Sequence, residues 1–239
     1  MIAPALLALA LAEVPGNVPP SSEPPPRAGS FEIFFAGYSP NIDSEFHNGA
    51  TPYATTLGTG RGFTFHVSGA KTVYDKWGSV DVGVSVGWFR DTGHGVYAIT
   101  SGGVTAGGAS PETSSLNVIP TAVFGTYRFD WAVDRYNVPV VPYTRLALER
   151  YNWWVIGSGG KTMQTGATNG WSVGFGLALL LDWFDRSLSR ELQRDTGVRH
   201  TYAFVETVHA SVNDFGSNKS WDMSDKQPWT LGGGIRFDF

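Results

Sequence analysis

One short stretch of the sequence combines a base with a nucleophile: His209 and Ser211, within the run His-Ala-Ser-Val-Asn. In an extended strand, residues two positions apart project from the same face. A histidine can then act as the base for a serine nucleophile, provided that a third group orients the imidazole. The spacing permits a serine hydrolase, but an H-x-S triplet also arises often by chance, and the simpler interpretation is an interfacial histidine followed by a serine that caps the strand end.

Charged residues on the less apolar strand faces form a second group of candidates. They are Glu32, Asp81, Arg145, Glu149, Asp182, Glu206 and Arg236, with His66 beside them. Arg145 and Glu149 are four positions apart in one strand, so they share a face. Because buried charges are normally paired, we expect an interior salt-bridge network. The functional alternative is a narrow, gated ion path.

Other kinds of site find no support in the residue pattern. The five histidines have no metal-ligand spacing, and the chain has no cysteine. No glycine pair lies between a strand and a helix in the way that phosphate binding needs. The net charge is −4, without a basic stripe. We therefore expect no metal, no cofactor and no nucleic-acid partner.

Eight extended segments position these residues. Val80, Val82, Val84, Val86 and Trp88 alternate with small or polar residues, and the run from Trp171 to Trp183 repeats the pattern. This period of two predicts strands. The segments are Ser30–Gly37, Gly62–Tyr74, Ser79–Phe89, Ser114–Phe129, Val141–Ile156, Thr168–Trp183, Arg199–Val212 and Pro228–Phe239.

Strand length and composition favour a membrane location. Transmembrane strands need about 9–11 residues, whereas no apolar run approaches the ~18–20 residues of a spanning helix. Only 16% of residues are charged and 14% are aromatic. We predict an all-β protein, an eight-stranded antiparallel up-and-down barrel in a bacterial outer membrane. Its interior is just wide enough for side chains, so it is no wide diffusion pore. The interface aromatics predicted are Trp88, Trp171, Trp183, Phe237 and Phe239.

The remaining segments complete the predicted topology. Residues 1–12 resemble the apolar core of a signal peptide, residues 13–29 form a Pro-rich linker, and residues 30–239 form the barrel. Long extracellular loops are expected, including 90–113, with a short periplasmic helix near 186–196. An even strand number places both termini in the periplasm. Pro120, Arg150 and the Glu206/His209 pair conflict with simple alternation and suggest bulges.

Several stretches resemble an uncharacterised family of outer-membrane β-barrel proteins of myxobacterial type. They include GSFEIFFAGYSPNIDSE at 29–45, VPVVPYTRLAL at 138–148, GFGLALLLDWFD at 174–185 and the terminal strand. The resemblance implies the fold and the location and assigns no activity. The closing Phe239 resembles the signal by which the barrel-assembly machinery recognises its substrates.

The His-x-Ser arrangement is similar to that of outer-membrane lipid A 3-O-deacylases, which act from the outer wall of a barrel. That resemblance implies His209 as base, Ser211 as nucleophile, and Asp222 or Asp225 as the acid. The chain departs from the pattern: Val212 stands where the family has Asn, and the acid is Asp instead of Glu. The preferred prediction is a structural or surface-binding barrel that contacts membrane lipid and lipopolysaccharide. Its surface loops would carry any protein partner; the lipid A ester hydrolase and the narrow channel are the alternatives.

Overall fold

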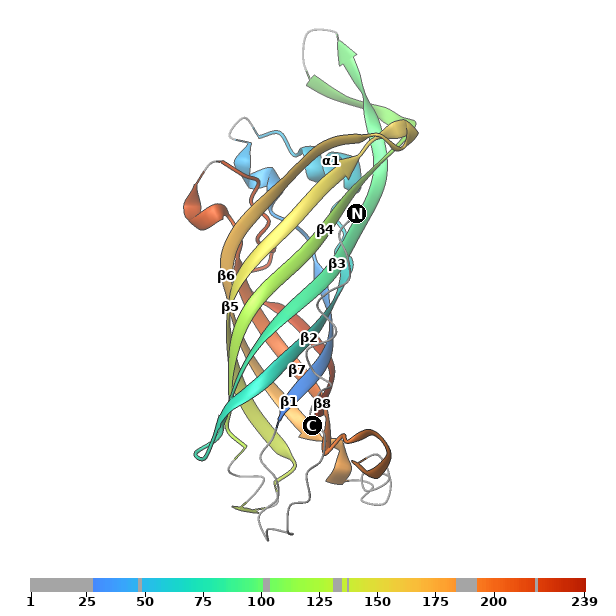
Figure 1. The fold of residues 1–239 in the computed structure, drawn as a ribbon. Coiled ribbons are helices and arrows are strands. Elements are labelled where there is room, and N and C mark those ends of the chain that lie inside the picture. Colours follow the sequence, from blue (N-terminus) through green and yellow to red (C-terminus); the bar gives the residue numbers. More distant parts are fainter. Residues whose placement is uncertain are drawn as a thin grey trace.

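The computed structural model describes residues 28–46, 49–100, 104–130, 135–136, 138–183, 193–217 and 219–239. Each strand pairs antiparallel with the next, and β1 pairs with β8, so the sheet closes into a barrel of eight strands (Figure 1). This confirms the predicted fold. The strands are β1 Gly29–Tyr38, β2 Gly62–Asp75, β3 Ser79–Thr100, β4 Val104–Arg128, β5 Val140–Ile156, β6 Thr162–Leu180, β7 His200–Ser211 and β8 Thr230–Asp238.

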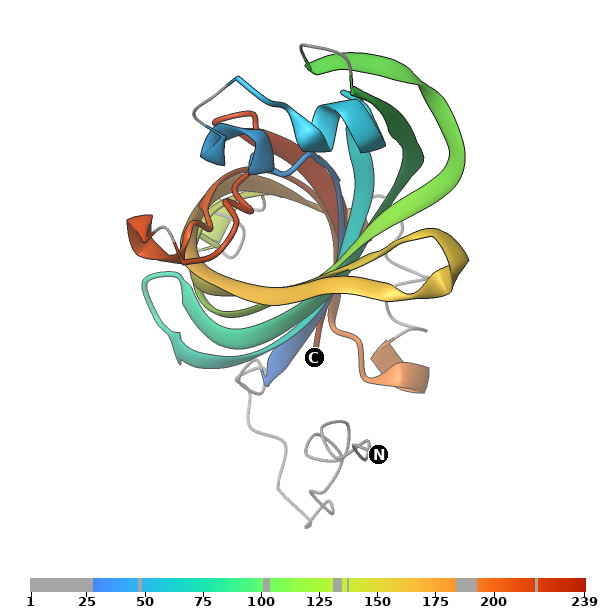
Figure 2. The ribbon, with the colours of Figure 1, turned by 90° about the horizontal axis from the view of Figure 1, so that it is seen from above.

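The barrel has two different ends. At the termini end, the Ala28 amide donates to the Phe239 carbonyl over 2.8 Å, and the short turn between β2 and β3 lies there as well. The loop end carries the connection between β1 and β2, with η1 (Ile42–Glu45) and α1 (Pro52–Leu57). It also carries η2 (Ser158–Gly160) and the connection between β7 and β8, with η4 (Asp214–Gly216). Figure 2 shows η1 beside the β7–β8 connection at the barrel mouth.

The prediction of a long loop at 90–113 is wrong, because most of this segment is β-strand. β3 and β4 continue through it as one hairpin that rises past the other strands at the loop end (Figure 1). Pairs such as Asp91 with Leu116 and Thr100 with Val104 extend the ladder. The segment is rich in Gly and Ser, which are turn formers, but its Val, Thr, Tyr and Ile residues favour strands. Whether this segment forms a strand depends on its pairing with the neighbouring strand, and the local sequence pattern does not predict such pairing.

The bulges expected at Pro120, Arg150 and Glu206/His209 are also absent. β4 and β5 pair without interruption from Ser115 opposite Ile156 to Arg128 opposite Tyr143. β6 and β7 likewise keep one register, so Glu206 faces inward and His209 outward by simple alternation. The register shifts lie elsewhere: between Thr72 and Tyr74, between His94 and Ala98, and between Val155 and Ile156.

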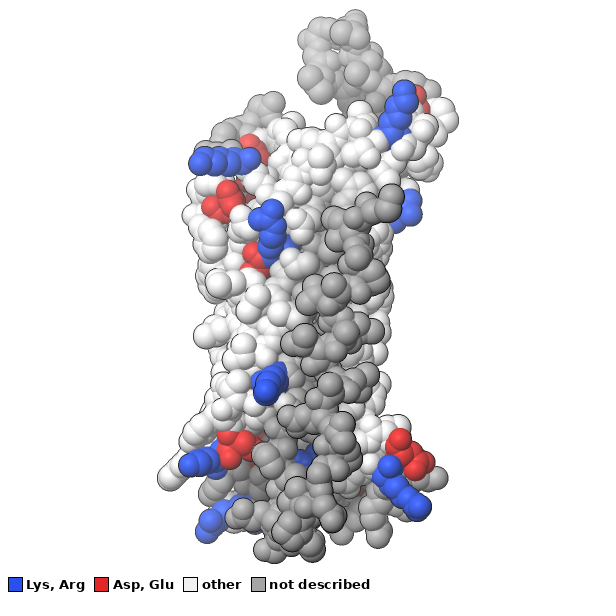
Figure 3. Space-filling model, in the orientation of Figure 1, with Lys and Arg blue, Asp and Glu red and all other residues white. Residues whose placement is uncertain are grey.

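The outer face of the barrel is a broad apolar belt. Its exposed side chains include Phe31, Phe35, Phe65, Val82, Val84, Val86, Val123, Leu146, Leu148, Phe175, Leu177, Val205, Leu231 and Ile235. Outward aromatic pairs occur toward both ends: Phe31 and Phe237 stack at 6.5 Å, and Trp88 and Trp154 meet at 5.7 Å. On the face drawn in Figure 3, most coloured charges gather toward the two ends of the barrel. Among the described residues, no helix is long and apolar enough to span a membrane.

One detail at the termini end differs from the prediction, and a second is only partly described. The sixth strand stops at Leu180, and Leu181–Trp183 form the 3-10 helix η3. Trp183 is therefore an exposed residue beyond the strand, not its last outward position. Of the helix predicted near 186–196, Gln193 to Thr196 are helical, and 186–192 lie outside the described residues.

Candidate functional site

The interior at the termini end is filled by a buried cluster of charges, which we call the plug. It consists of Arg128, Arg145 and Arg236 with Glu32, Asp81, Asp130, Glu206 and Asp238. Arg236 is the centre: its guanidinium reaches Glu32 and Asp238 at 2.7 Å and Asp81 at 2.6 Å. Each of its three nitrogens donates to a different carboxylate, and such charge-assisted hydrogen bonds are roughly twice as strong as neutral ones. They join β1, β3 and β8 inside the barrel.

Arg128 and Arg145 complete the plug. Arg128 donates to Asp238 over 2.8 Å, and its Nε atom forms an ion pair with Asp81 at 3.2 Å. Arg145 bonds to Glu32 at 2.5 Å and lies 3.6 Å from Glu206, whose carboxylate also accepts the Tyr143 hydroxyl. A buried charge is tolerated when it is paired and hydrogen-bonded. Every plug charge is paired with an opposite charge, and of the Arg128 nitrogens Nη1 also donates a hydrogen bond, to Asp238.

Five of the seven predicted interior charges meet in the plug: Glu32, Asp81, Arg145, Glu206 and Arg236. Glu149 does face the interior, but its carboxylate accepts from Ser172 at 2.7 Å instead of pairing with Arg145. Asp182 was wrongly assigned to the interior network. It lies in η3, where it bonds to the His200 imidazole at 2.9 Å and to the Thr201 amide at 3.2 Å.

Three plug residues were missed: Arg128, Asp130 and Asp238. A usable signal existed for Asp238, because it is two positions from Arg236 on the same face of the terminal strand. Arg128 also shares a face with Thr126, which the structure buries. Asp130 lies beyond the end of β4, where strand alternation does not predict which way a side chain points. It accepts a 2.6 Å hydrogen bond from the Ser79 hydroxyl, which fixes its position.

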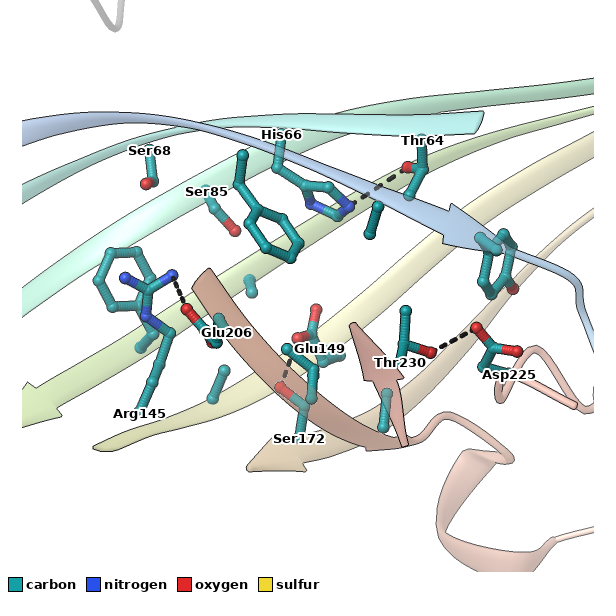
Figure 4. A pocket seen from close by; sticks show the side chains of 18 of the residues that line it. Thr64, His66, Ser68, Ser85, Arg145, Glu149, Ser172, Glu206, Asp225 and Thr230 are labelled. Carbon is teal, nitrogen blue, oxygen red and sulfur yellow. Dashed lines mark hydrogen bonds and ion pairs between the residues drawn. The ribbon is translucent and has the colours of Figure 1, made fainter. Parts of the chain in front are cut away.

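A small cavity lies between the plug and the mouth (Figure 4). Its volume is about 100 Å³, and Arg145, Glu149, Glu206 and His66 line it. His66 is fixed by a 3.3 Å contact with the Thr64 hydroxyl and by the Phe34 ring at 6.0 Å. The space suits a few water molecules, which need polar partners of this kind. Among the described residues, no group of three or more His, Asp or Glu side chains could hold a metal ion.

Apolar side chains close the interior at the loop end. We call them the mouth cluster: Tyr38, Ile42, Tyr53, Phe89, Leu116, Val118, Tyr151, Trp153, Val212 and Met223. The rings of Tyr38 and Phe89 meet edge to face at 4.8 Å, and Trp153 stacks on Trp221 at 4.2 Å. The interior of an eight-stranded barrel is just wide enough for side chains to fill it. The mouth cluster therefore blocks the path above the cavity as the plug blocks it below.

The two long connections at the loop end are bound to each other, and we call their described residues, 39–46 and 49–61 with 212–217 and 219–229, the cap. Arg61 makes a bidentate pair with Asp225, with bonds of 3.0 and 2.7 Å. Asn41 donates to Asp222 over 2.9 Å, and Lys226 pairs with Asp43 at 3.1 Å. The cap is thus a single hydrogen-bonded unit over the mouth.

Helix α1 is seated on the β3–β4 hairpin. The Asp43 carboxylate accepts from the amides of Tyr53 at 2.7 Å and Ala54 at 3.2 Å, which satisfies the first turn. The Tyr53 hydroxyl donates to Asp91 on β3 over 2.6 Å. Burial and this bond raise the pKa of Tyr53 well above its usual value, so the phenol stays a donor. Gly93 leaves the room for this contact, because a Cβ there would meet the Thr56 carbonyl.

An apolar pocket opens between α1 and strands β4 and β5, and we call it the mouth pocket. Its volume is about 200 Å³. Its lining comes from η1, α1, β4, β5 and the β7–β8 connection: Ile42, Phe46, Pro52, Tyr53, Thr56, Leu57, Ser114, Ser115, Leu116, Val155 and Trp221. The sequence gives no local sign of it, because its walls are far apart along the chain.

The candidate catalytic residues are not assembled as the hydrolase prediction requires. His209 and Ser211 share the outward face of β7, as predicted. The His209 Nδ1 atom, however, lies 2.6 Å from the Pro228 carbonyl, and the ring sits between Trp171 and Trp229 at 5.6 and 5.4 Å. Asp222 and Asp225 are engaged within the cap, with Asn41 and Arg61 respectively.

No protein-family model and no curated protein matches the sequence, so both resemblances remain predictions. Solved structures with a similar fold include OprG from Pseudomonas aeruginosa, with 14% identity and a TM-score of 0.47 over 89% of this chain and 97% of that one. Another is Neisserial surface protein A, with 13% identity and a TM-score of 0.46 over 88% and 96%. The N-terminal barrel domain of Pseudomonas aeruginosa OprF has 14% identity and a TM-score of 0.43 over 90% and 100%. Similarity at this level leaves the function to be argued from the geometry.

Proposed function

We propose that this protein is an outer-membrane barrel that is closed to diffusion and acts by binding at its loop end. The observation that carries this proposal is the double closure of the interior. The plug fills the barrel at one end and the mouth cluster at the other, with a cavity of only about 100 Å³ between them. A protein closed in this way interacts with its surroundings through its wall and its cap.

The apolar belt supports the membrane location. Monomeric soluble proteins rarely expose contiguous apolar patches larger than a few hundred Å². Here the belt continues from strand to strand: Val84 lies opposite Val123 in register, and Val123 lies opposite Leu148. Such a surface is stable when lipid covers it. Membrane lipid and lipopolysaccharide are therefore its proposed partners along the wall, and the barrel-assembly machinery its partner during insertion.

Single cysteines test the location and the orientation together, because the chain has no cysteine of its own. Lys161→Cys lies at the loop end and Lys76→Cys in the turn at the termini end. With the loop end outside, a membrane-impermeant maleimide labels Lys161→Cys in intact cells. It labels Lys76→Cys only after the outer membrane is permeabilised. The reverse pattern contradicts the orientation, and recovery of the protein in the periplasmic fraction contradicts the membrane location.

A conductance measurement distinguishes the proposal of a closed barrel from the alternative of a narrow channel. The purified protein in a planar bilayer is expected to give no steady current, because neither end of the interior offers a continuous water path. A reference porin in the same bilayer shows that insertion can be detected. Steady current from the wild type that changes on Arg145→Ala, with Lys71→Ala on the outer wall as the matched control, would establish an ion path through the plug.

A further inference from the structure

The mouth pocket has the features of a ligand site. Its volume is about 200 Å³, and the side chains that line it are apolar, aromatic or hydroxyl-bearing. Small-molecule sites are typically concave and mostly apolar, with a few polar groups. The lining residues Thr56, Ser114 and Ser115 supply the polar groups here. The pocket wall is also fixed by bonds from its lining residue Tyr53 to Asp43 and Asp91, which hold α1 in position.

Size and charge define what the pocket accepts. A dry apolar cavity of about 150 Å³ holds a benzene molecule. A pocket of about 200 Å³ therefore takes one ring or two fused rings. None of its described lining residues is charged, so a charged ligand would lose its hydration without gaining an ion pair. The rings of Phe46, Tyr53 and Trp221 offer edges and faces for aromatic contact.

The position of the pocket favours a free molecule over a segment of this chain. The described chain begins at Ala28, which is bonded to Phe239 at the termini end, on the far side of the plug and the mouth cluster. The pocket itself is lined by α1 and β4 residues at the loop end, where the β3–β4 hairpin rises past the other strands (Figure 1). A small molecule in the external medium reaches that position directly.

We propose that the mouth pocket binds one small, neutral aromatic molecule of one or two rings from the external side. This assignment rests on the proposed function, because it needs the loop end to face the medium. It gives the binding role of the cap a ligand class. The ligand lies between α1 and the inner face of β4, with its ring against Trp221 and its polar atom at the serine and threonine hydroxyls.

Binding is measured with the full chain folded in lipid nanodiscs, with 5-fluoroindole as the probe. Detergent is avoided because its alkyl chains would compete for the pocket. The fluorine resonance of the probe is expected to broaden with the wild type, and unlabelled indole should displace the probe. Empty nanodiscs correct for partition into lipid. Indole-3-acetate, which has the same ring with a negative charge, is expected to bind at least about tenfold more weakly.

Two variants on β4 place the binding at the mouth pocket. Ser114→Phe fills the pocket with a ring and is expected to abolish saturable binding. Thr113→Phe adds the same ring at the adjacent position, which is exposed and does not line the pocket, and should bind as the wild type does. Heat-modifiable mobility on gels shows that both variants fold.

Three results would overturn the assignment: no saturable binding to the wild type, equal binding to both phenylalanine variants, or tighter binding of indole-3-acetate than of indole. These results are independent of the proposed function. The cysteine labelling and conductance measurements report location and closure whether or not indole binds. A failed ligand assignment therefore leaves a closed barrel with an unfilled pocket, whereas reversed labelling removes the premise of external access.

Discussion

Glu32 and Arg236 face each other in register across the seam that closes the barrel, with 2.7 Å between Oε1 and Nη1. Strand β1 ends the sheet on one side and β8 on the other, so this pair joins the two ends of the described chain. Both side chains are almost completely buried, at 3% and 4% exposure. The seam is thus held by charges inside the barrel as well as by the backbone ladder.

Replacing Arg236 by Met should destabilise the barrel strongly. The change leaves Glu32, Asp81 and Asp238 buried with too few cations. Breaking a buried pair on one side typically costs about 3–5 kcal/mol. Urea unfolding in lipid vesicles, followed by tryptophan fluorescence, measures the loss. Lys71→Met removes a cation from the exposed outer side of β2 and should cost far less. Equal losses for the two variants would mean that the plug does not stabilise the seam.

Replacing Arg61 by Ala should loosen the cap without unfolding the barrel. Arg61 is 28% exposed, so solvent screens its pair with Asp225, and a cost of about 1 kcal/mol or less is expected. Hydrogen exchange should quicken in residues 39–46, 49–61 and 219–229 and stay unchanged in the strands. Arg90→Ala, an exposed arginine outside the cap, serves as the matched control. Faster exchange throughout the strands would show that the cap and the barrel unfold together.

The bond between Tyr53 and Asp91 should depend on pH only in the alkaline range. The pKa of Tyr53 is raised in the folded protein, so the neutral phenol is the stabilised form. Its contribution is therefore complete below the ordinary tyrosine pKa of 10.0 and is lost as the pH rises through the higher folded value. The ultraviolet titration of wild type minus Tyr53→Phe should show one phenol that ionises later than an exposed tyrosine.

At neutral pH, Tyr53→Phe leaves the Asp91 carboxylate without this donor and should cost about 1–2 kcal/mol. The loss should disappear at a pH where the wild-type phenol is itself ionised. A difference spectrum with an ordinary tyrosine step near 10.0 would show that the phenol is not held by Asp91.

Local alternation was enough to predict the barrel, because lipid-facing and interior residues alternate wherever a strand is half covered. The run from Val80 to Trp88 is such a case. Alternation also placed Arg236 and Glu206 inside. It failed where long-range pairing decides the structure: the extension of β3 beyond Phe89 depends on β4, and Asp182 left the interior because β6 ends at Leu180. The mouth pocket needs Tyr53, Leu116 and Trp221 together, and no spacing along the chain encodes that.

Ser211→Ala should leave lipid A unchanged. A serine hydrolase needs an acid that orients the histidine. Here the Pro228 carbonyl occupies Nδ1 of His209, while Asp222 and Asp225 hold the cap together. Mass spectrometry compares the acyl chains of lipid A from cells that express the wild type, Ser211→Ala or neither. Loss of one ester-linked acyl chain only with the wild type would establish the enzyme and would require the cap to rearrange.

Replacing Leu146 by Arg should reveal whether lipid covers the belt. Leu146 is 62% exposed and lies on β5 opposite Gly125 and Val173. In a soluble barrel, an exposed leucine changes to arginine within about 0.5 kcal/mol. In a membrane, an arginine on the lipid face near the midplane costs about 2–4 kcal/mol, and near the interface only about 0–1 kcal/mol. Val138→Arg, placed at the termini end before β5 begins, is the matched interfacial control. Urea unfolding in vesicles should therefore separate the two variants by more than 1 kcal/mol if the belt faces lipid. Equal stability would place this surface in water, and the apolar belt would then need a protein to cover it.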